Sequence, residues 1–317
     1  MDKSNWIEPM EPVLRSDVIK GKEWIHQVKW DGIRGLCYVT RGEVRVFTKR
    51  GRERTDYYPE ITGITALLRE ESVILDGEIV SLDQDDKPSF QRMQIRERVA
   101  DPQKVLHYAK LYPARYIVFD ILSLKGKSLT DLPFHERMAY LEKTLIKSEN
   151  ITTTDSFPDG ESLLNLMRER NWEGIVSKKI NSPYTGGKAH QDWYKTKLNK
   201  KLLAVLCGLS MKDSLPNSLV LGVNRGKGLE YIGKASSGLS QEHLKLLKDS
   251  LPDLQSDEPA FKSASSELRG VVWLKPLVTL WVSFLEWTRD GSIRHPKILG
   301  FSAESPSMAN GAEFPDT

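Results

Sequence analysis

The stretch that decides the fold of this chain is Lys29-Trp30-Asp31-Gly32-Ile33-Arg34. It places one lysine next to an acid, a glycine and an arginine, shortly after the apolar pair Trp24-Ile25. Lysine is a poor nucleophile while it is protonated, and desolvation or a nearby cation such as Arg34 favours the reactive free amine. Gly32 allows the backbone to turn sharply or to approach a ligand closely. The stretch therefore predicts an amine nucleophile, although a strand ending in a solvated Asp-Gly turn has the same pattern.

Strands and helices are expected to interleave irregularly around this stretch. Three segments rich in β-branched residues predict strands at 44–48, 73–80 and 115–122. Helices are expected at 59–69, 133–146 and 161–170; the second begins at Pro133, a favoured first-turn residue. Because strands and helices do not alternate steadily, the pattern predicts an α+β domain with antiparallel sheets.

The composition changes near residues 198–202, and beyond this point the chain is mostly strand-like. Five expected strands (202–209, 218–223, 229–234, 270–274 and 280–287) and one helix (240–250) predict a small β-barrel of the OB-fold type. Trp273, Trp281 and Trp287 are then expected in its core. The predicted domains are 1–199 and 200–304. The polar tail 305–317 is expected to be disordered.

Composition excludes several classes of protein. The chain is 39% hydrophobic and 28% charged, as in soluble globular proteins. No apolar run approaches the roughly 20 residues that cross a bilayer, and the N-terminus has no signal-peptide pattern, so we expect no membrane association and a cytoplasmic location. Cys37 and Cys207 lie in apolar surroundings and are predicted to be buried thiols. The six histidines lack metal-ligand spacing, so zinc is not expected.

The charge distribution is more informative than the net charge of +3. Residues 49–54 and 195–201 are dense basic segments with aromatic residues nearby. Phosphate binding explains such segments, and so does an ordinary solvated surface.

Further segments supply the acids, lysines and aromatic groups that a nucleotide site needs. In chain order the candidates are Glu78, Phe119, Glu173, Lys178, Lys195 and Lys197. The last two are expected on one face, because alternate residues of a strand point the same way. Singly, each has an ordinary structural explanation. Jointly, in this order and ahead of a barrel, they predict one site.

In these motifs the chain resembles the covalent nucleotidyltransferases and, within them, the ATP-dependent DNA ligases of the bacterial end-joining type. The resemblance covers residues 9–300 and includes the segments 89–94, 272–276 and 287–296. The last two favour the end-joining type over capping enzymes and RNA ligases. The resemblance implies a nucleotidyltransferase (adenylation) domain followed by an OB-fold domain.

The resemblance also implies a reaction in three steps. Lys29 attacks the α-phosphate of ATP and forms lysyl-AMP, the AMP passes to the 5′-phosphate at a nick, and the 3′-hydroxyl then expels AMP. Each step is a phosphoryl-type transfer, which depends on positioning and charge stabilisation.

A role for each site residue follows from the same resemblance. Arg34 and Glu78 are expected to hold the ribose, Phe119 to stack on adenine, and Lys195 with Lys197 to neutralise the α-phosphate. Further nucleotide contacts are expected from Gln27, Lys49, Arg50 and Lys178. A divalent ion, Mg²⁺ or Mn²⁺, is expected on Glu173, with Glu78 and Asp31 as further ligands.

The chain departs from the family pattern in three places. Gln27 stands where the family usually has glutamate, and Lys49 stands where it has arginine, without the planar fork of a guanidinium. After Gly300 the family's basic motif is replaced by residues 301–305, Phe-Ser-Ala-Glu-Ser. Self-adenylation is then expected to be slow, unless Arg294 and Lys297 serve in place of that motif.

The expected substrate is nicked or broken double-stranded DNA, bound by a monomer without an extra N-terminal DNA-binding domain. By analogy, its partners are the DNA-end-binding protein Ku and a separate polymerase or nuclease. Two alternatives stay open at this point: an RNA ligase or RNA-repair nucleotidyltransferase, and a nucleic-acid-binding protein with impaired adenylation.

Overall fold

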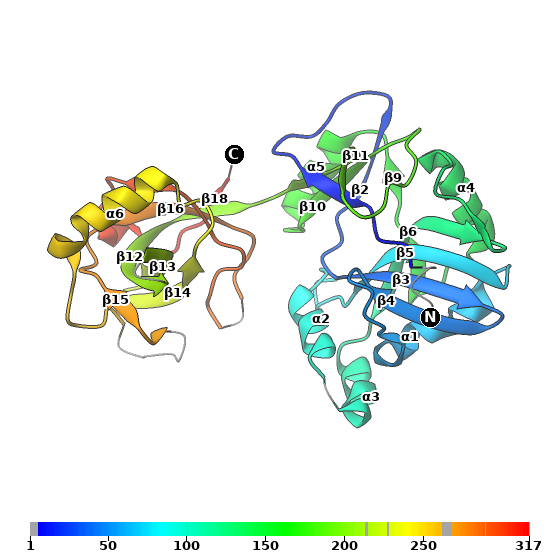
Figure 1. Cartoon of the computed structure of the whole chain (residues 1–317), viewed down its shortest axis with the longest axis horizontal. Helices are drawn as coiled ribbons and strands as arrows, with labels where there is room; N and C mark the ends of the chain where they lie inside the picture. The colour runs from blue at the N-terminus through cyan, green and yellow to red at the C-terminus, as the bar shows by residue number, and fades with distance from the viewer. Residues whose placement is uncertain are drawn as a thin grey trace. The chain divides into compact units, whose positions relative to one another are not determined.

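The chain forms two compact units, Met1–Lys197 and Leu198–Thr317. The computed structural model describes residues 6–99, 101–212, 215–226, 228–261, 268–288 and 290–316 (Figure 1). Each unit has its own hydrophobic core. We therefore describe the two units one at a time.

Unit 1 contains a five-stranded sheet in the order β1-β11-β10-β2-β9. All its strand pairs are antiparallel except β1 with β11. The strands are β1 (Glu11–Leu14), β2 (Trp24–Val28), β9 (Ser156–Phe157), β10 (Gly174–Lys179) and β11 (Ala189–Lys197). This sheet brings the segment before Lys29 next to the strands that follow Glu173 and precede Leu198.

A second sheet in unit 1 has the order β4-β3-β5-β6-β7, with β8 paired to β6. Its strands are β3 (Ile33–Thr40), β4 (Glu43–Thr48), β5 (Ser72–Val80), β6 (Arg115–Leu124), β7 (Lys127–Ser128) and β8 (Ile151–Thr153). All pairs are antiparallel except β6 with β8. The three strands predicted in this region are confirmed, as is the α+β class.

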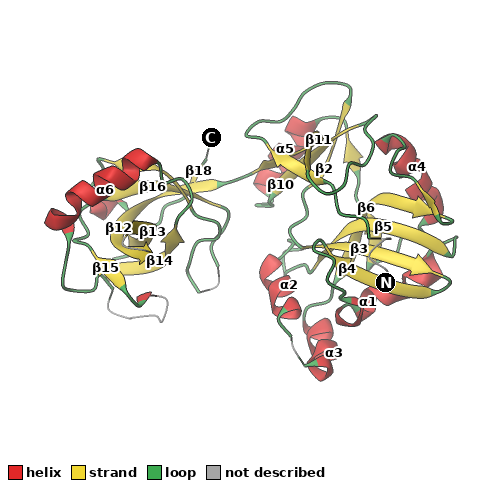
Figure 2. Cartoon of the chain, in the orientation of Figure 1, coloured by secondary structure: helices red, strands yellow, loops and turns green. Residues whose placement is uncertain are grey.

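Helices pack beside both sheets, α1 and α2 near β5 and β6 and α5 near β2 and β10 (Figure 2). They are α1 (Pro59–Thr62), α2 (Phe90–Glu97), α3 (Pro102–Leu111), α4 (Phe134–Thr144) and α5 (Gly160–Glu169), with 3-10 turns η2 (Thr55–Tyr57) and η3 (Gly63–Leu67). The predictions at 133–146 and 161–170 are confirmed. The sequence pattern did not predict α2 or α3.

The prediction of one α-helix over 59–69 is wrong. The α-helix ends at Thr62 and continues as the 3-10 turn η3. Ile64 and Thr65 are β-branched, which lowers their preference for an α-helix. Ile61 and Ile64 are both fully buried, and their three-residue spacing suits a 3-10 turn.

Unit 2 is a strongly bent antiparallel sheet in the order β14-β13-β12-β16-β17, with β15 and β18 also paired to β12. Its elements are β12 (Lys200–Lys212), β13 (Leu215–Asn224), β14 (Leu229–Ala235), α6 (Gln241–Leu254), β15 (Val271–Trp273), β16 (Thr279–Phe284), β17 (Lys297–Ser302), η5 (Pro306–Met308) and β18 (Phe314–Pro315). A bridge from Ser237, after β14, to Lys297 in β17 joins the two edges. The predicted OB-fold barrel is confirmed.

Three tryptophans of unit 2 lie against its core, as predicted. Trp287 packs on the cluster inside the barrel, and Trp273 and Trp281 pack on a second cluster around Phe261. Cys37 and Cys207 are both free and buried. Burial raises the pKa of the Cys37 thiol to about 12, so this sulfur is packed as a small hydrophobe.

The tail is not disordered over residues 305–316, which corrects the sequence prediction. Ala309 is fully buried, and its carbonyl accepts a hydrogen bond from Asn224 N at 2.6 Å. β18 then pairs with the start of β12, and the Phe314 ring packs edge-on against Trp281, with centroids 5.6 Å apart. These contacts order a segment whose composition is otherwise typical of disorder. Among the described residues, no helix is long and apolar enough to span a membrane.

Candidate nucleotide-binding and catalytic site

A cavity of about 150 Å³ in unit 1 gathers most of the predicted site residues. Its lining comes from β2, β10 and β11 of one sheet and from β3, β5 and β6 of the other. The predicted residues that line it are Gln27, Lys29, Arg34, Lys49, Glu78, Phe119, Lys178 and Lys195. The remaining wall includes Glu11, Trp30 and Trp193. Residues separated by more than 160 positions thus form one site.

Lys29 lies just after β2 and is held against the start of β10. Its backbone N–H donates to Gly174 O at 2.9 Å. Gly174 has φ +138°, and a Cβ there would collide with Thr196 O, so only glycine allows this approach. Gly32 is equally constrained, because a Cβ would collide with Ile79 O. Gly32 therefore allows a close approach to the Ile79 backbone, and its predicted approach to a ligand stays a prediction.

Glu173 bridges two lysines at the cavity. Lys29 Nζ donates to Glu173 Oε2 at 2.5 Å, and Lys197 Nζ lies 2.8 Å from Glu173 Oε1. The Glu173 side chain is 4% exposed. Burial alone would raise the pKa of Glu173, but the Lys29 and Lys197 cations outweigh it and lower that pKa below its usual value. Glu173 is therefore an ionised acceptor that fixes the position of the Lys29 amine.

Glu78 is a second, half-buried acid in the site. It lies opposite Arg34 in the register of β3 and β5. Burial raises the pKa of Glu78 to about 8, although the Lys29 and Arg34 cations oppose the shift. Burial also lowers the pKa of Lys195, helped by the charges of Lys197 and Lys29. The site thus combines three lysines with two carboxyl groups in a desolvated setting.

Arg34 is tied to the protein interior. Its Nε and Nη2 donate to Asp76 Oδ1 and Oδ2 at 2.6 and 2.5 Å, and Tyr184 Oη donates to Asp76 at 2.7 Å. Its guanidinium carbon lies 4.7 Å from the centroid of the Phe119 ring. Asp76 occupies two of the N–H groups that a ribose would need. The ribose contact of Arg34 stays a prediction, and the structure adds a positioning role beside Phe119.

Lys178 lies behind the aromatic wall of the cavity. Its Nζ is 4.1 Å from the ring centroid of Trp193, 4.5 Å from that of Phe119 and 4.7 Å from that of Phe134. It also donates to Phe119 O at 3.0 Å. Burial lowers the pKa of Lys178 to about 7, against the opposing charge of Asp120. Its ammonium group therefore supports the ring that is expected to stack on adenine.

Four further residues of the predicted site lie in or near the cavity, and two of them, Gln27 and Lys49, depart from the family pattern. Gln27 is buried, and its Nε2 donates to Ser156 Oγ at 2.9 Å. Lys49 pairs with Glu11 at 2.7 Å, whereas Arg50 is exposed and lies outside the cavity lining. Asp31 is half-buried next to the lining, and its charge raises the pKa of Glu78.

The two basic residues considered as replacements for the missing motif lie in unit 2. Arg294 Nη1 pairs with Glu286 Oε1 at 2.9 Å, and Lys297 begins β17. Phe301 and Ser302, in place of the motif, continue β17 and pair with β16.

Two residues of the site were missed although the sequence signalled them. Asp76 shares a face with Glu78, and Trp193 shares a face with Lys195 and Lys197, by the alternation of strand residues. Within the described residues, no group of three or more histidine, cysteine or acidic side chains is arranged to hold a metal ion.

Comparison with known proteins accounts for this architecture. Residues 10–197 match the profile of the ATP dependent DNA ligase domain, and residues 212–304 match that of the ATP dependent DNA ligase C terminal region. The chain belongs to the ATP-dependent DNA ligase family.

Within this family, the similarity extends to bacterial end-joining proteins. The chain is 32% identical to the multifunctional non-homologous end joining protein LigD of Mycolicibacterium smegmatis, over 89% of this chain and 36% of that protein. The bifunctional LigD of Bacillus subtilis is 26% identical, over 92% of this chain and 48% of its own length. The chain therefore spans less than half of these curated relatives.

A solved structure agrees with this similarity. The mycobacterial DNA ligase D complexed with ATP and MES has a TM-score of 0.57 and 28% identity, covering 98% of this chain and 99% of that one. This chain is thus of the bacterial end-joining ligase type, and the RNA-ligase alternative is not favoured.

Proposed function

We propose that this chain seals nicks or breaks in DNA with ATP, through an AMP group carried on Lys29. The observation that carries the proposal is the Lys29–Glu173–Lys197 bridge at a cavity walled by Phe119 and Trp193. The Lys29 amine is held there beside further cations, at a cavity of about 150 Å³. A phosphoryl-transfer site needs this positioning and charge stabilisation.

In the first step, Lys29 Nζ attacks the α-phosphate of ATP. The Lys29 ammonium first gives a proton to solvent and attacks as the free amine; a nitrogen–phosphorus bond then forms, the bond to pyrophosphate breaks, and a second proton leaves the nitrogen to solvent. Lys195 and Lys197 offset the negative charge that gathers on the transferring phosphate. Glu173 holds the amine in place until ATP arrives.

The aromatic wall favours a purine ring on Phe119. Lys178 and Arg34 place positive charge behind that ring, and the Gln27 amide can accept or donate one hydrogen bond at the base edge. Glu78, with its raised pKa, can donate a hydrogen bond to the ribose as a neutral acid below pH 8.

The donor set also fits Mg²⁺ or Mn²⁺. Glu173 is buried and Glu78 is half-buried, and they are close enough for the charge of Glu173 to raise the pKa of Glu78. Magnesium is commonly held by one or two carboxylates together with substrate phosphates, so a three-ligand protein cage is not required. Such an ion, when bound, would neutralise charge on the transferring phosphate.

The later steps return the enzyme to its starting state. An oxygen of the DNA 5′-phosphate attacks the lysyl-AMP phosphorus, which breaks the nitrogen–phosphorus bond and frees Lys29. The 3′-hydroxyl then attacks the 5′-phosphate, forms the phosphodiester bond and releases AMP. Lys29 is not a nucleophile in this last step, so the last step is expected to survive its loss.

Action in DNA end joining is supported by the similarity to the LigD relatives, which are non-homologous end joining proteins. This chain spans only 36% of the M. smegmatis protein, so polymerase or nuclease activities would come from other polypeptides or segments. We include the DNA-end-binding protein Ku as a partner in this proposal. Stimulation of blunt-end joining by added Ku tests that part alone.

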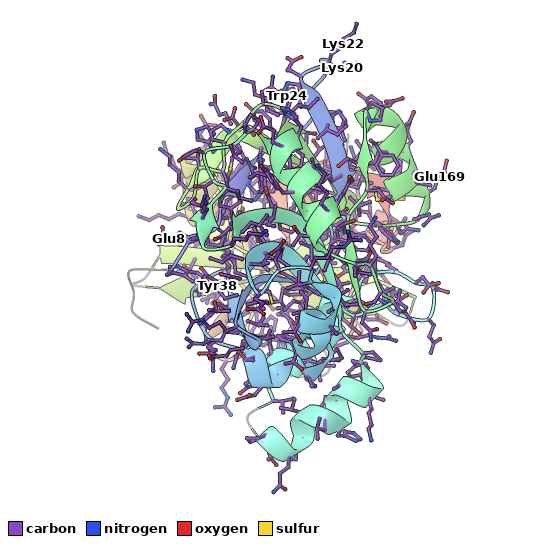
Figure 3. All side chains as sticks on the ribbon, turned by 90° about the vertical axis from the view of Figure 1, so that its right-hand side faces the viewer. Glu8, Lys20, Lys22, Trp24, Tyr38 and Glu169 are labelled. Atoms are coloured by element: carbon purple, nitrogen blue, oxygen red, sulfur yellow. The ribbon has the colours of Figure 1, made fainter. Side chains whose placement is uncertain are left out.

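The experiment follows AMP on the protein and sealing of the nick separately. Lys29→Ala should take up no label from α-labelled ATP, yet should still seal a nick that carries a 5′-adenylate. Lys22→Ala is a matched control, because Lys22 lies in the exposed loop before β2 and points away from the body of unit 1 (Figure 3). Uptake of label by Lys29→Ala would refute the assignment.

Two further arms define the substrates. GTP and NAD replace ATP, and RNA replaces DNA on either side of the nick. Treatment with pyrophosphate before labelling removes AMP already bound, so that a pre-loaded sample is not mistaken for an inactive one. A wild-type protein that stays unlabelled after this treatment would favour a DNA-binding protein with impaired adenylation.

A further inference from the structure

A second hollow in unit 1 shares Val28 and Trp30 with the nucleotide cavity. It holds about 390 Å³ and lies among α5, the segment that follows β8 and the turn into β10. Figure 1 shows α5 beside β2 and β10, the strands whose ends carry Lys29 and Glu173. Because Val28 and Trp30 line both spaces, the hollow adjoins the cavity that Lys29 lines.

Two tryptophans, with their rings tilted against each other, form a half-buried wall of this hollow. Trp30 and Trp172 have ring centroids 5.3 Å apart at an interplanar angle of 51°, and Trp30 Nε1 donates to Thr154 Oγ1 at 3.1 Å. Trp172 N donates to Met167 O at 2.9 Å, which fixes Trp172 at the end of α5. Leu166, on the same helix, is 38% exposed beside them. The core therefore leaves Trp30 and Trp172 half-buried at this hollow, and an indole ring there can contact a flat ligand.

Cations lie next to this aromatic wall. The Arg170 guanidinium carbon is 5.7 Å from the Trp172 ring centroid, and Lys147 also lines the hollow. Both side chains are exposed, and within the described parts of the chain neither forms an ion pair. Thr152, Thr154 and Asp155 add hydroxyl and carboxylate oxygens to the lining. A flat ring with amino groups and a neighbouring phosphate would satisfy the wall, the acceptors and the cations together.

We propose that this hollow binds one unpaired nucleotide of a DNA strand at the break. The base stacks on the Trp172 ring beside Trp30, and its phosphate lies at Arg170 and Lys147. This inference rests on the proposed ligase function and adds a substrate preference to it. Stacking on aromatic side chains tolerates any base, since every base has a π-face. A flapped or mismatched nucleotide would thereby be held beside Lys29 while the paired ends are joined.

The test uses the whole chain, cleared of AMP with pyrophosphate and without ATP. The probe is a nicked duplex with one unpaired 2-aminopurine beside the nick, and the reference is the same nick fully paired. Wild type should quench the probe. Trp172→Ala should weaken binding of the unpaired probe by about tenfold, within the range for loss of one stacking contact, without changing binding of the paired nick. Trp172→Phe, which keeps a ring, should restore most of the preference.

Arg170→Ala and Arg168→Ala form a matched pair on the same helical turn. Arg168 bonds to Asn165 and does not line the hollow, so its loss should leave the preference intact, whereas loss of Arg170 should reduce it. If Trp172→Ala and Arg170→Ala weaken binding of the unpaired and the paired duplex equally, these two residues have a structural role and the inference is overturned. Absence of quenching in wild type would do the same.

Free 2-aminopurine riboside monophosphate tests whether the hollow binds a mononucleotide instead of a nucleotide within DNA. If it is quenched with the same affinity as the DNA probe, the hollow is a mononucleotide site and the DNA inference is wrong. Failure of the ligase proposal has a different signature: wild type would not seal the paired nick with ATP, whatever happens to the 2-aminopurine signal.

Discussion

The Arg34–Asp76 pair should be one of the largest single contributions to the stability of unit 1. Asp76 is 0% exposed and Arg34 14%, and the carboxylate accepts two bonds from the guanidinium and one from Tyr184 Oη. Asp76→Leu leaves the guanidinium buried without its counter-charge. Breaking a buried pair in this way costs about 3–5 kcal/mol. Arg34→Met leaves the carboxylate unpaired and should cost a similar amount.

The double variant Arg34→Met/Asp76→Leu separates charge from packing. It removes both charges, and it leaves the Tyr184 hydroxyl without its acceptor and Met10 O without the Arg34 donor, each at about 1–3 kcal/mol; each single variant already loses one of these bonds and in addition keeps an unpaired charge. The double variant should therefore be more stable than either single variant. Urea unfolding, followed by tryptophan fluorescence and fitted with a separate transition for each unit, measures these free energies.

An exposed ion pair in the same unit provides the control. Arg115 and Glu149 lie 3.4 Å apart with side chains 37% and 83% exposed, so Glu149→Ala should cost less than about 1 kcal/mol. Additive costs in the double variant, or an Asp76→Leu cost as small as that of Glu149→Ala, would refute the reasoning.

Four further predictions concern the site. The pKa of Glu78 is about 8 in the folded protein and 4.5 in the unfolded chain, so the stabilisation from protonated Glu78 is complete below pH 4.5 and is lost as the pH rises to 8. Wild type should therefore lose stability relative to Glu78→Gln between these pH values, as measured by urea unfolding at several pH values. The pKa of Lys178 is about 7 in the folded protein and 10.5 in the unfolded chain, so the unfolded chain binds more protons between these pH values. Wild type should therefore gain stability relative to Lys178→Met as the pH rises from 7 to 10.5. Phe119→Ala should raise the KM for ATP in AMP labelling by about tenfold or more, whereas Phe119→Tyr should not; equal KM values would exclude stacking. Arg294→Ala should not change the rate of AMP labelling, because Arg294 already pairs with Glu286, and a slower rate would identify it as a substitute for the basic motif absent after Gly300.

Local patterns were sufficient to predict much of the site. The alternation of strand residues places Lys195 and Lys197 together, and it also contained Trp193 and Asp76, which were overlooked. The partners of Arg34 and Lys178 could not be predicted in this way. Asp76 is 42 residues from Arg34, and Phe119 is 59 residues from Lys178. The pairing of β3 with β5 brings Arg34 to Asp76, and Lys178 on β10 of one sheet meets Phe119 on β6 of the other.

The prediction from composition was wrong in the C-terminal tail, where a few specific contacts order the chain. The tail 305–316 has the small polar residues of a disordered segment, but burial of Ala309 and packing of Phe314 on Trp281 order it. Helical propensity likewise failed at 59–69, where burial of both Ile61 and Ile64 favours the tighter 3-10 turn.

The charge balance around Glu173 changes when Lys29 takes up AMP. While Lys29 is free, Glu173 has two cationic partners, Lys29 and Lys197. Once Lys29 carries AMP, its nitrogen is neutral and one carboxylate oxygen loses its charged partner. The site that carries AMP therefore has one positive charge fewer when it next binds a DNA phosphate. The same chemical event that stores the AMP thus releases an anionic ligand for a metal ion or an incoming proton.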